Sequence, residues 1–259
     1  MDVASPNHSE IDSRISSKED EFAFLSIFDI VFLIDDSGSM DGSRWREAQT
    51  TIKSLIPICV EHDADGVDLH YLHKKNRKDE SAGWREMTDA SEIDRLFSAV
   101  KPAGGTPTGK RLNDILDPYV KLYEMADKAK RKEIKPLLLV VITDGEANDD
   151  VDEVIINIAD RLNEVDAPRH QVGIQFFQVG DDEKATEHLK HLDEGLKCSR
   201  DIVDTCSFDQ RCLDTGERTL TGYGVLKTLL GSVQSKYDKE RLPVKMTSTK
   251  GSTSRNAAS

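Results

Sequence analysis

The feature that most constrains the fold of this chain is an alternation between short apolar runs and longer amphipathic segments. The runs lie at 27–34, 67–72, 136–143, 172–179 and, more weakly, 201–203. Each run has the length of one buried strand, whereas the segments between them repeat apolar residues at spacings of three and four, as one face of a helix does. Continuous apolar strands are typical of parallel sheets, which are covered on both faces.

The segments between the runs predict helices at 45–60, 91–100, 108–129, 151–165, 182–196 and 220–237. We expect Pro57 to kink or end the first of them, because a proline ring removes a backbone hydrogen bond from a helix. Strands and helices that alternate in this way form open, mostly parallel sheets with helices on both faces. The sequence therefore predicts a doubly wound α/β domain.

The predicted domain extends from residue 21 to residue 242, with a polar segment on either side. Residues 1–20 and 243–259 have no periodic apolar face, so we expect both to be disordered tails. The first tail lacks the basic start and apolar middle of a signal peptide, and no apolar run reaches the roughly 18 residues of a membrane span. These features predict an intracellular, cytoplasmic protein whose cysteines are buried thiols.

The charge of the chain excludes one broad class of partner. With 35 Lys and Arg against 48 Asp and Glu, the net charge is −13. A protein that neutralises nucleic-acid phosphates needs a basic surface, so nucleic acid is not expected as a partner. The acids are also concentrated locally, because residues 144–153 hold six acids and no base.

Oxygen-bearing side chains gather where predicted strands end. Ligands of open α/β sheets bind outside the carboxyl ends of the strands, so loops at these positions are the first candidates for a site. Carboxylate and hydroxyl oxygens suit a hard cation. We expect Mg²⁺, with Mn²⁺ compatible with the same ligands, and Ca²⁺ is less favoured because it usually recruits more carboxylates. The candidate metal ligands are Asp35, Ser37, Ser39, Asp144 and either Thr106 or Thr108.

Three segments carry a resemblance to a known family. They are Asp35-x-Ser37-x-Ser39 after an apolar strand, the loop Gly104-Gly105-Thr106, and the segment Val-Ile-Thr-Asp-Gly-Glu at 141–146. Together they closely resemble the von Willebrand factor type A domain and its metal-ion-dependent adhesion site. The resemblance covers roughly residues 29 to 230 in order and spacing. It implies that the five motif positions, and hence the metal ligands, are Asp35, Ser37, Ser39, Thr106 and Asp144.

The resemblance implies a Rossmann-like open sheet and a mode of action. It implies that Ser37, Ser39 and Thr106 bind the cation through their hydroxyls, that the two aspartates act directly or through water, and that a carboxylate of the ligand completes the shell. The expected function is a non-enzymatic, cation-dependent protein-binding module for adhesion or scaffolding. Because the run at 144–153 is acidic, we expect a partner that pairs its Asp or Glu with flanking Lys or Arg.

A nucleotide-hydrolysing P-loop is one enzymatic alternative. The segment from Gly104 to Lys110 satisfies the first seven positions of that motif, and the strand ending in Asp144 could supply its magnesium partner. However, Arg111 stands where the motif needs Ser or Thr to bind magnesium, and no clear strand precedes the loop. The match is therefore incomplete.

A magnesium-dependent phosphatase of the haloacid dehalogenase type is the other alternative. Asp35 would be its nucleophile and Lys110 its charge stabiliser, and Asp144 and Asp149 would bind magnesium. Such enzymes generally place a second Asp two residues after the nucleophile as the general acid. Ser37 occupies that position, and a serine does not readily donate a proton at neutral pH.

Overall fold

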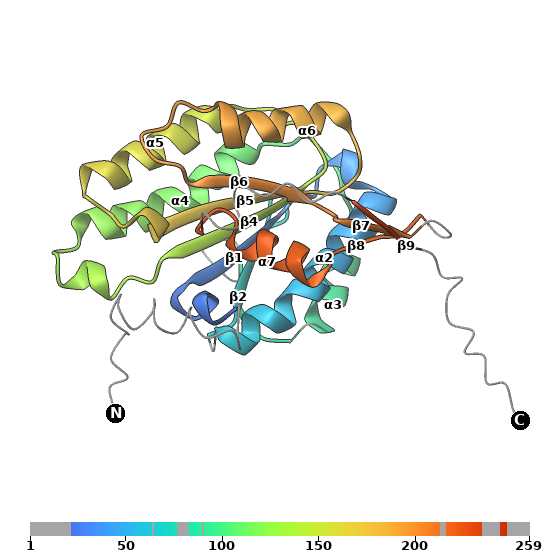
Figure 1. Cartoon of the computed structure of the whole chain (residues 1–259), viewed down its shortest axis with the longest axis horizontal. Helices are drawn as coiled ribbons and strands as arrows, with labels where there is room; N and C mark the ends of the chain where they lie inside the picture. The colour runs from blue at the N-terminus through green and yellow to red at the C-terminus, as the bar shows by residue number, and fades with distance from the viewer. Residues whose placement is uncertain are drawn as a thin grey trace, which may run out of the picture.

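The computed structural model describes residues 22–63, 65–76, 83–89, 91–212, 216–234 and 244–247. Within them, six strands form one sheet in the order β3-β2-β1-β4-β5-β6 (Figure 1). The strands are β1 (Asp29–Ile34), β2 (Val67–Tyr71), β3 (Trp84–Met87), β4 (Leu137–Thr143), β5 (Val172–Gln178) and β6 (Val203–Ser207). The edge strand β3 runs antiparallel to β2, and the other pairings are parallel.

Helices cover both faces of the sheet, as Figure 1 shows. The first face carries α2 (Ser43–His62), α3 (Ser91–Ala99) and α7 (Gly222–Leu230). The second face carries α4 (Thr108–Met125), α5 (Val151–Glu164) and α6 (Glu183–Lys190). Alternate residues of a strand supply the two cores, so that Phe32 packs under the first layer and Leu33 under the second. The predicted doubly wound α/β fold is confirmed.

Short turns complete the described secondary structure. Single 3-10 turns lie at Ala23–Ile27, Gly38–Met40, Lys130–Lys132 and Arg169–Gln171, and a π turn at His191–Gly195 continues α6. The expected end of the first helix at Pro57 does not occur, since α2 continues to His62. Buried side chains on both sides of the proline, Ile56 and Cys59 among them, hold this stretch against the core.

A buried ion pair joins β6 to α7. Lys227 Nζ lies 2.8 and 3.1 Å from the carboxylate oxygens of Asp204, and the two side chains are only 7% and 1% exposed. Burial raises the pKa of Asp204 to about 6, against the attraction of Lys227. A Cβ at Gly231 would collide with the same carboxylate, so the backbone after α7 approaches β6 closely. This pair explains how Asp204 can be buried on the edge strand β6.

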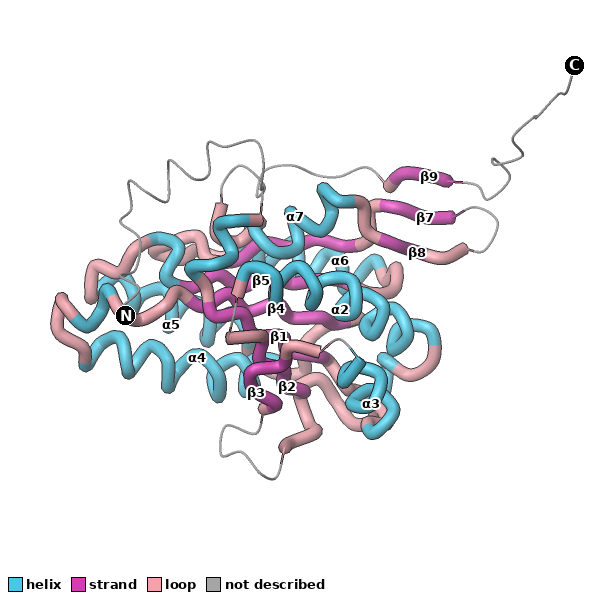
Figure 2. Tube along the Cα trace, turned by 90° about the horizontal axis from the view of Figure 1, so that it is seen from below, coloured by secondary structure: helices cyan, strands magenta, loops and turns pink. Residues whose placement is uncertain are grey.

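A second, small sheet lies beside the main one (Figure 2). Its strands are β7 (Gln210–Cys212), β8 (Arg218–Thr219) and β9 (Lys245–Thr247), in the order β8-β7-β9. Arg218 ties it to the main fold, because its Nη2 lies 2.6 Å from Glu47 Oε1 of α2 and its Nη1 donates to the Gly180 carbonyl after β5 at 2.5 Å. The small sheet is therefore held at the carboxyl edge of β5.

The structure differs from the sequence prediction in part of the C-terminal tail. Residues 244–247 fall within the segment 243–259 that was expected to be disordered, yet 245–247 form β9 and pair with β7. The backbone of β7 supplies hydrogen bonds that a hydropathy pattern does not register. The rest of that segment, and all of residues 1–20, lie outside the described residues.

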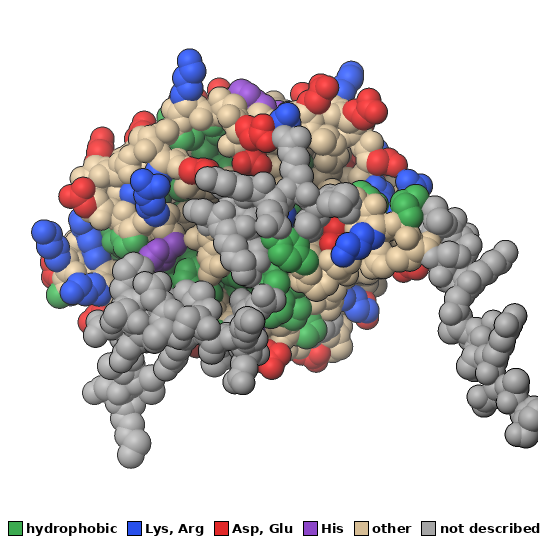
Figure 3. All heavy atoms as spheres, viewed as in Figure 1, with side chains coloured by type: hydrophobic (Ala, Val, Ile, Leu, Met, Phe, Trp, Pro, Cys, Tyr) green, Lys and Arg blue, Asp and Glu red, His purple; other side chains and the backbone are tan. Residues whose placement is uncertain are grey.

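One face of the molecule carries charged side chains of both signs, without a large patch of either. Figure 3 shows acidic and basic side chains scattered over one face of the molecule. Within the described ranges, no helix combines the length and the apolar character needed to cross a bilayer.

Candidate metal centre

The predicted ligands lie at the point of the sheet where the strand order reverses. β1 has β2 on one side and β4 on the other, so the chain is wound in both directions from it. Asp35 follows β1 and Asp144 follows β4, and these neighbouring strands are in register with Ile34 opposite Ile142. The two carboxylates are thus delivered to one crevice, which is where open α/β sheets bind their ligands.

Asp35 is buried and fixed by hydrogen bonds. Its backbone N–H donates to the Ile142 carbonyl at 2.9 Å. One carboxylate oxygen accepts the Ser37 N–H at 2.8 Å and the other accepts the Thr143 hydroxyl at 2.7 Å. Burial raises the pKa of the Asp35 carboxyl above its usual value, against the hydrogen bonds from Ser37 and Thr143. A cation at this edge would therefore stabilise a carboxylate that the fold has already removed from water.

The two serine hydroxyls and Asp144 form a continuous row of oxygens. Ser37 Oγ lies 3.0 Å from Ser39 Oγ, and Ser39 Oγ donates to Asp144 Oδ1 at 2.9 Å. Separations of this size are those of O–H···O hydrogen bonds, so the three side chains face one another directly. Their hydroxyl and carboxylate oxygens are donors of the type that a hard cation such as Mg²⁺ takes.

The loop that carries Thr106 is joined to the other two loops through main-chain groups. Gly38 N–H donates to the Gly104 carbonyl at 3.0 Å, which links this loop to the serines. On the other side, Asn148 N–H donates to the Thr106 carbonyl at 2.8 Å, and Thr106 N–H donates to the Asn148 side-chain oxygen. Thr106 is only 7% exposed. All five predicted ligands therefore lie in three loops that are bonded to one another.

Two residues of the site were not found from the sequence. Arg44 Nη1 lies 2.6 Å from Asp144 Oδ2, and Asn148 holds the Thr106 backbone. Neither residue directly follows a strand, which is the pattern that identified the ligands. Each contacts a residue that is far away in the chain, Asp144 for Arg44 and Thr106 for Asn148. Asn148 follows the end of β4 by five residues, which is the one sequence signal that could have drawn attention to it.

The acidic run at 144–153 serves in part to cap helices. The carboxylate of Asp149 accepts the N–H groups of Gly109 and Lys110 at 2.9 and 2.7 Å, at the start of α4. Asp150 accepts the Glu153 N–H at 2.9 Å and caps α5. Carboxylates at helix N-termini satisfy free N–H groups and complement the helix dipole. Part of the negative charge is thus balanced within the fold.

The enzymatic alternatives find little support in this geometry. Both oxygens of Asp149 bind backbone N–H groups of α4, so this residue is engaged elsewhere and not as a magnesium ligand of a phosphatase. The Gly104 loop is reached from α3 through residues 100–103, which contain no strand, whereas a P-loop follows one. In the part of the chain that the structure describes, no three His, Cys, Asp or Glu side chains gather as a metal site.

Asn148→Ala is expected to loosen the Thr106 loop. The substitution removes the acceptor of the buried Thr106 N–H, and an unsatisfied buried donor costs about 1–3 kcal/mol. We therefore expect hydrogen exchange of the Thr106 amide to be at least about fivefold faster, as measured by NMR. Asn157→Ala, on an exposed position of α5, is the matched control. An unchanged exchange rate at Thr106 would contradict the role assigned to Asn148.

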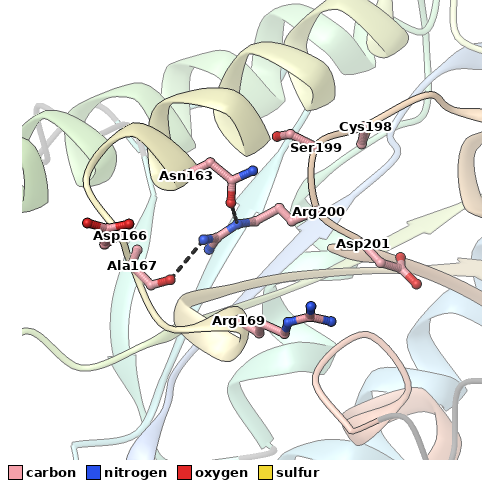
Figure 4. A pocket seen from close by; sticks show the side chains of 8 residues that line it. All are labelled: Asn163, Asp166, Ala167, Arg169, Cys198, Ser199, Arg200 and Asp201. Atoms are coloured by element: carbon pink, nitrogen blue, oxygen red, sulfur yellow. Dashed lines mark hydrogen bonds between the residues drawn. The ribbon is translucent and has the colours of Figure 1, made fainter.

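A polar cleft of about 450 Å³ lies at the opposite edge of the sheet, where β5 and β6 begin. Figure 4 shows Arg200 at its centre, with hydrogen bonds to the Asn163 side chain and the Ala167 carbonyl, both 2.8 Å long. Arg169 and Asp201 also line it. The Arg200 guanidinium therefore donates its hydrogen bonds to α5 and to the connection that follows it, and these bonds stabilise the walls of the cleft.

Comparison with known proteins agrees with this architecture. The von Willebrand factor type A domain matches residues 29–209. Among curated proteins, the collagen alpha-5(VI) chain of Mus musculus is 27% identical over 240 residues, which cover 83% of this chain and 9% of the collagen chain. The collagen alpha-6(VI) chain of Mus musculus is 24% identical over 195 residues, which cover 72% of this chain and 8% of that collagen chain. The chain thus spans less than a tenth of these relatives.

Among solved structures, proximal thread matrix protein 1 from the mussel byssus is similar over 69% of this chain and 43% of the mussel protein chain. The TM-score of that match is 0.39 and the sequence identity is 16%.

The predicted cytoplasmic location is contradicted by the curated relatives. They are collagen chains, which are proteins of the extracellular matrix, and not cytoplasmic proteins. The prediction relied on the composition of residues 1–20, and the relatives are better guides to location than a short terminal segment. An intracellular assignment is therefore wrong on this comparison.

The matched region begins at the first residue of β1 and ends just after β6, so it contains the whole main sheet and all three loops of the candidate metal centre. It covers well over half of the chain. Apart from the edge strand β3, which the sequence did not predict, its main strands and helices follow in the predicted order. The chain belongs to the von Willebrand factor type A domain family.

Proposed function

We propose that this domain is a divalent-cation-dependent protein-binding module with a metal-ion-dependent adhesion site, and that its ion is Mg²⁺. The hydroxyls of Ser37, Ser39 and Thr106 would hold the ion, with Asp35 and Asp144 bound directly or through water. The observation that carries the proposal is the convergence of oxygens from two neighbouring strand ends. Ser37 Oγ lies 3.0 Å from Ser39 Oγ, and Ser39 Oγ lies 2.9 Å from Asp144 Oδ1, so hydroxyl and carboxylate oxygens of the kind that Mg²⁺ takes face one another at the crevice.

The bound ion would supply an electrophilic centre that accepts a carboxylate oxygen of the partner. Around it, the loops at 41–44 and 146–150 would contact the flanking residues of the ligand. Because Glu146 and Asp150 lie close to Asp144 in the chain, basic residues beside the partner's Asp or Glu would be favoured. The collagen relatives support an adhesion or scaffold role in an extracellular setting.

We propose binding and not catalysis at this site. The position two residues after Asp35 is Ser37, whose hydroxyl lies in the row of oxygens beside Ser39 and is no general acid. The two curated relatives described above are collagen chains. A metal-dependent phosphotransfer activity that Asp35→Asn abolishes would contradict this assignment.

Calorimetric titration of the full chain tests whether the cation binds. MgCl₂ and MnCl₂ are expected to bind one site and to raise the melting temperature, and CaCl₂ to bind more weakly. Excess chelator should return the melting temperature to its starting value. The absence of both heat and a melting shift with magnesium and manganese would rule out the proposed site.

Ligand binding is expected to require the cation and to weaken with salt. An array of peptides that each carry one Asp or Glu, with Lys, Ser or Glu as neighbours, should retain the protein in Mg²⁺ and lose it in chelator. Peptides with basic neighbours should bind best, and raising the salt from about 0.05 to 0.3 M should weaken them most, because screening shortens the reach of surface charges. Equal retention with and without Mg²⁺ would contradict cation bridging.

A further inference from the structure

We propose that Arg44 sets the charge of the cation site: it lowers the affinity for the divalent ion and raises the affinity of the loaded site for a carboxylate ligand. The inference rests on the proposed function, and it assigns a specificity-determining role to a residue outside the five ligand positions. It follows from how the two oxygens of Asp144 are shared, from what holds Arg44 in place, and from the charges that remain.

The two oxygens of Asp144 have different partners. Oδ1 accepts the Ser39 hydroxyl at 2.9 Å and so belongs to the row of oxygens that fits the cation. Oδ2 accepts Arg44 Nη1 at 2.6 Å, and the same nitrogen donates to the Ser39 carbonyl at 3.2 Å. The Asp144 side chain is 1% exposed and that of Arg44 is 32% exposed. Arg44 therefore reaches in from solvent and neutralises a buried ligand from its far side.

Arg44 is held in this position by the end of β5. Its side chain packs on Gly180, where an added Cβ would come within 3.0 Å of Arg44 Nε. Gly180 has φ +77°, a backbone conformation that favours glycine. Because glycine has no side chain, Arg44 can pack directly on its backbone. The guanidinium thus lies between the end of β5 and the end of β4, beside the crevice.

The nearest acid on the same helix does not compete for Arg44. Glu47 lies one turn further along α2, but its Oε1 is 2.6 Å from Arg218 Nη2 and its Oε2 accepts the Gly180 N–H at 2.9 Å. Glu47 and Arg218 balance one another. The charge of Arg44 is thus left to Asp144 and to whatever binds beside it.

The consequence for the ion and its immediate charged partners is an excess of positive charge after loading. A divalent ion cancels the charges of Asp35 and Asp144, and Arg44 then adds one positive charge in excess. This charge repels the cation and attracts an incoming carboxylate, and both effects act over a few Å in a partly buried crevice where screening is weak. The two affinities should therefore change in opposite directions when Arg44 loses its charge.

The test compares Arg44→Gln with Arg46→Gln in the full chain. Arg46 is an exposed neighbour on the same helix, so its replacement makes the same change in net charge. Mn²⁺ binding is measured by the loss of the free-ion EPR signal, and carboxylate binding by the relaxation of acetate methyl protons in Mn²⁺-loaded protein. We expect Arg44→Gln to bind Mn²⁺ about fivefold more tightly and acetate about fivefold more weakly. Arg46→Gln should stay within about twofold of the wild type in both.

The outcomes separate this inference from the proposed function. If the wild type binds no Mn²⁺, the proposed function fails and the inference fails with it. If the wild type binds Mn²⁺ but Arg44→Gln leaves either affinity unchanged, or lowers both, only the role of Arg44 is overturned, and a parallel loss in both would mark it as a structural residue. Arg44→Lys keeps the charge and should resemble the wild type; a result like that of Arg44→Gln would overturn a role based on charge.

Discussion

Replacing Asp35 by alanine is expected to weaken Mg²⁺ binding by at least about 100-fold, which corresponds to about 2.7 kcal/mol. The substitution removes one of the two carboxylates at the crevice. It also removes the acceptor of the Ser37 N–H and of the Thr143 hydroxyl, which keep the loop after β1 in shape. The variant therefore loses a negative charge at the site and the hydrogen bonds that fix the loop. The remaining hydroxyls compete poorly with the water ligands of a hydrated divalent ion.

Two measurements check this result. Calorimetry gives the affinity directly, and thermal unfolding reports it independently, because a ligand present at about 100 times its Kd stabilises the folded state by about 2.7 kcal/mol. The wild type should show this gain with Mg²⁺ and Asp35→Ala should not. Asp41→Ala is the matched control, since Asp41 is an exposed acid in the same loop region whose carboxylate contacts only the Gly42 N–H among the described residues. Similar Mg²⁺ affinities for wild type and Asp35→Ala would remove Asp35 from the site.

The variant Lys227→Met is expected to lose about 3–5 kcal/mol of unfolding free energy at neutral pH. Removing one partner of a buried ion pair leaves the other charge without compensation, and the Asp204 side chain is 1% exposed. Urea unfolding monitored by circular dichroism measures the loss. Lys184→Met, on the exposed side of α6, should change stability by less than about 0.5 kcal/mol.

The pH dependence of Lys227→Met provides a second readout. Burial already raises the pKa of Asp204 to about 6 with Lys227 present, and removal of the lysine raises it further. Since the folded state then holds this proton more tightly than the unfolded state, the contribution of Asp204 to stability improves as the pH falls toward the ordinary pKa of an aspartate. Part of the lost stability should thus return between about pH 7 and pH 5.

The double variant Asp204→Leu, Lys227→Met provides the control for packing. Replacing both members of a buried pair by apolar groups of similar size is often neutral or stabilising. The double variant should therefore recover most of the loss and show no such pH dependence. If it is as unstable as Lys227→Met, packing around α7 and not the ion pair accounts for the effect.

The main sheet could be predicted because most of its strands are buried on both faces. β1, β4 and β5 consist almost wholly of buried residues, and their apolar runs are plain in the sequence. β6 was placed too early, at 201–203, because its later residues are polar. Asp204 is acceptable inside the fold only through Lys227, which lies on a different element, and a local pattern cannot register that pairing.

The small sheet could not be predicted for a related reason. β8 has two residues and β9 has three, which is too short for any periodicity. Their position depends on contacts such as that between Arg218 and Glu47, whose sequence separation is 171 residues. Likewise, the candidate ligands could be identified because each lies at a strand end or in a glycine-rich loop, whereas Arg44 and Asn148 are defined only by the groups they contact.

The three loops of the candidate metal centre are joined largely by main-chain atoms. The Gly38 N–H meets the Gly104 carbonyl, the Ala103 N–H meets the Asp36 carbonyl, and the Asn148 N–H meets the Thr106 carbonyl. Such bonds survive when the side chains around them are exchanged. Outer positions such as Asp41 and Glu146, both exposed, are therefore free to diverge while the frame of the site persists. Partner choice and cation retention can thus evolve at separate positions, and a new specificity can be engineered on this edge without rebuilding it.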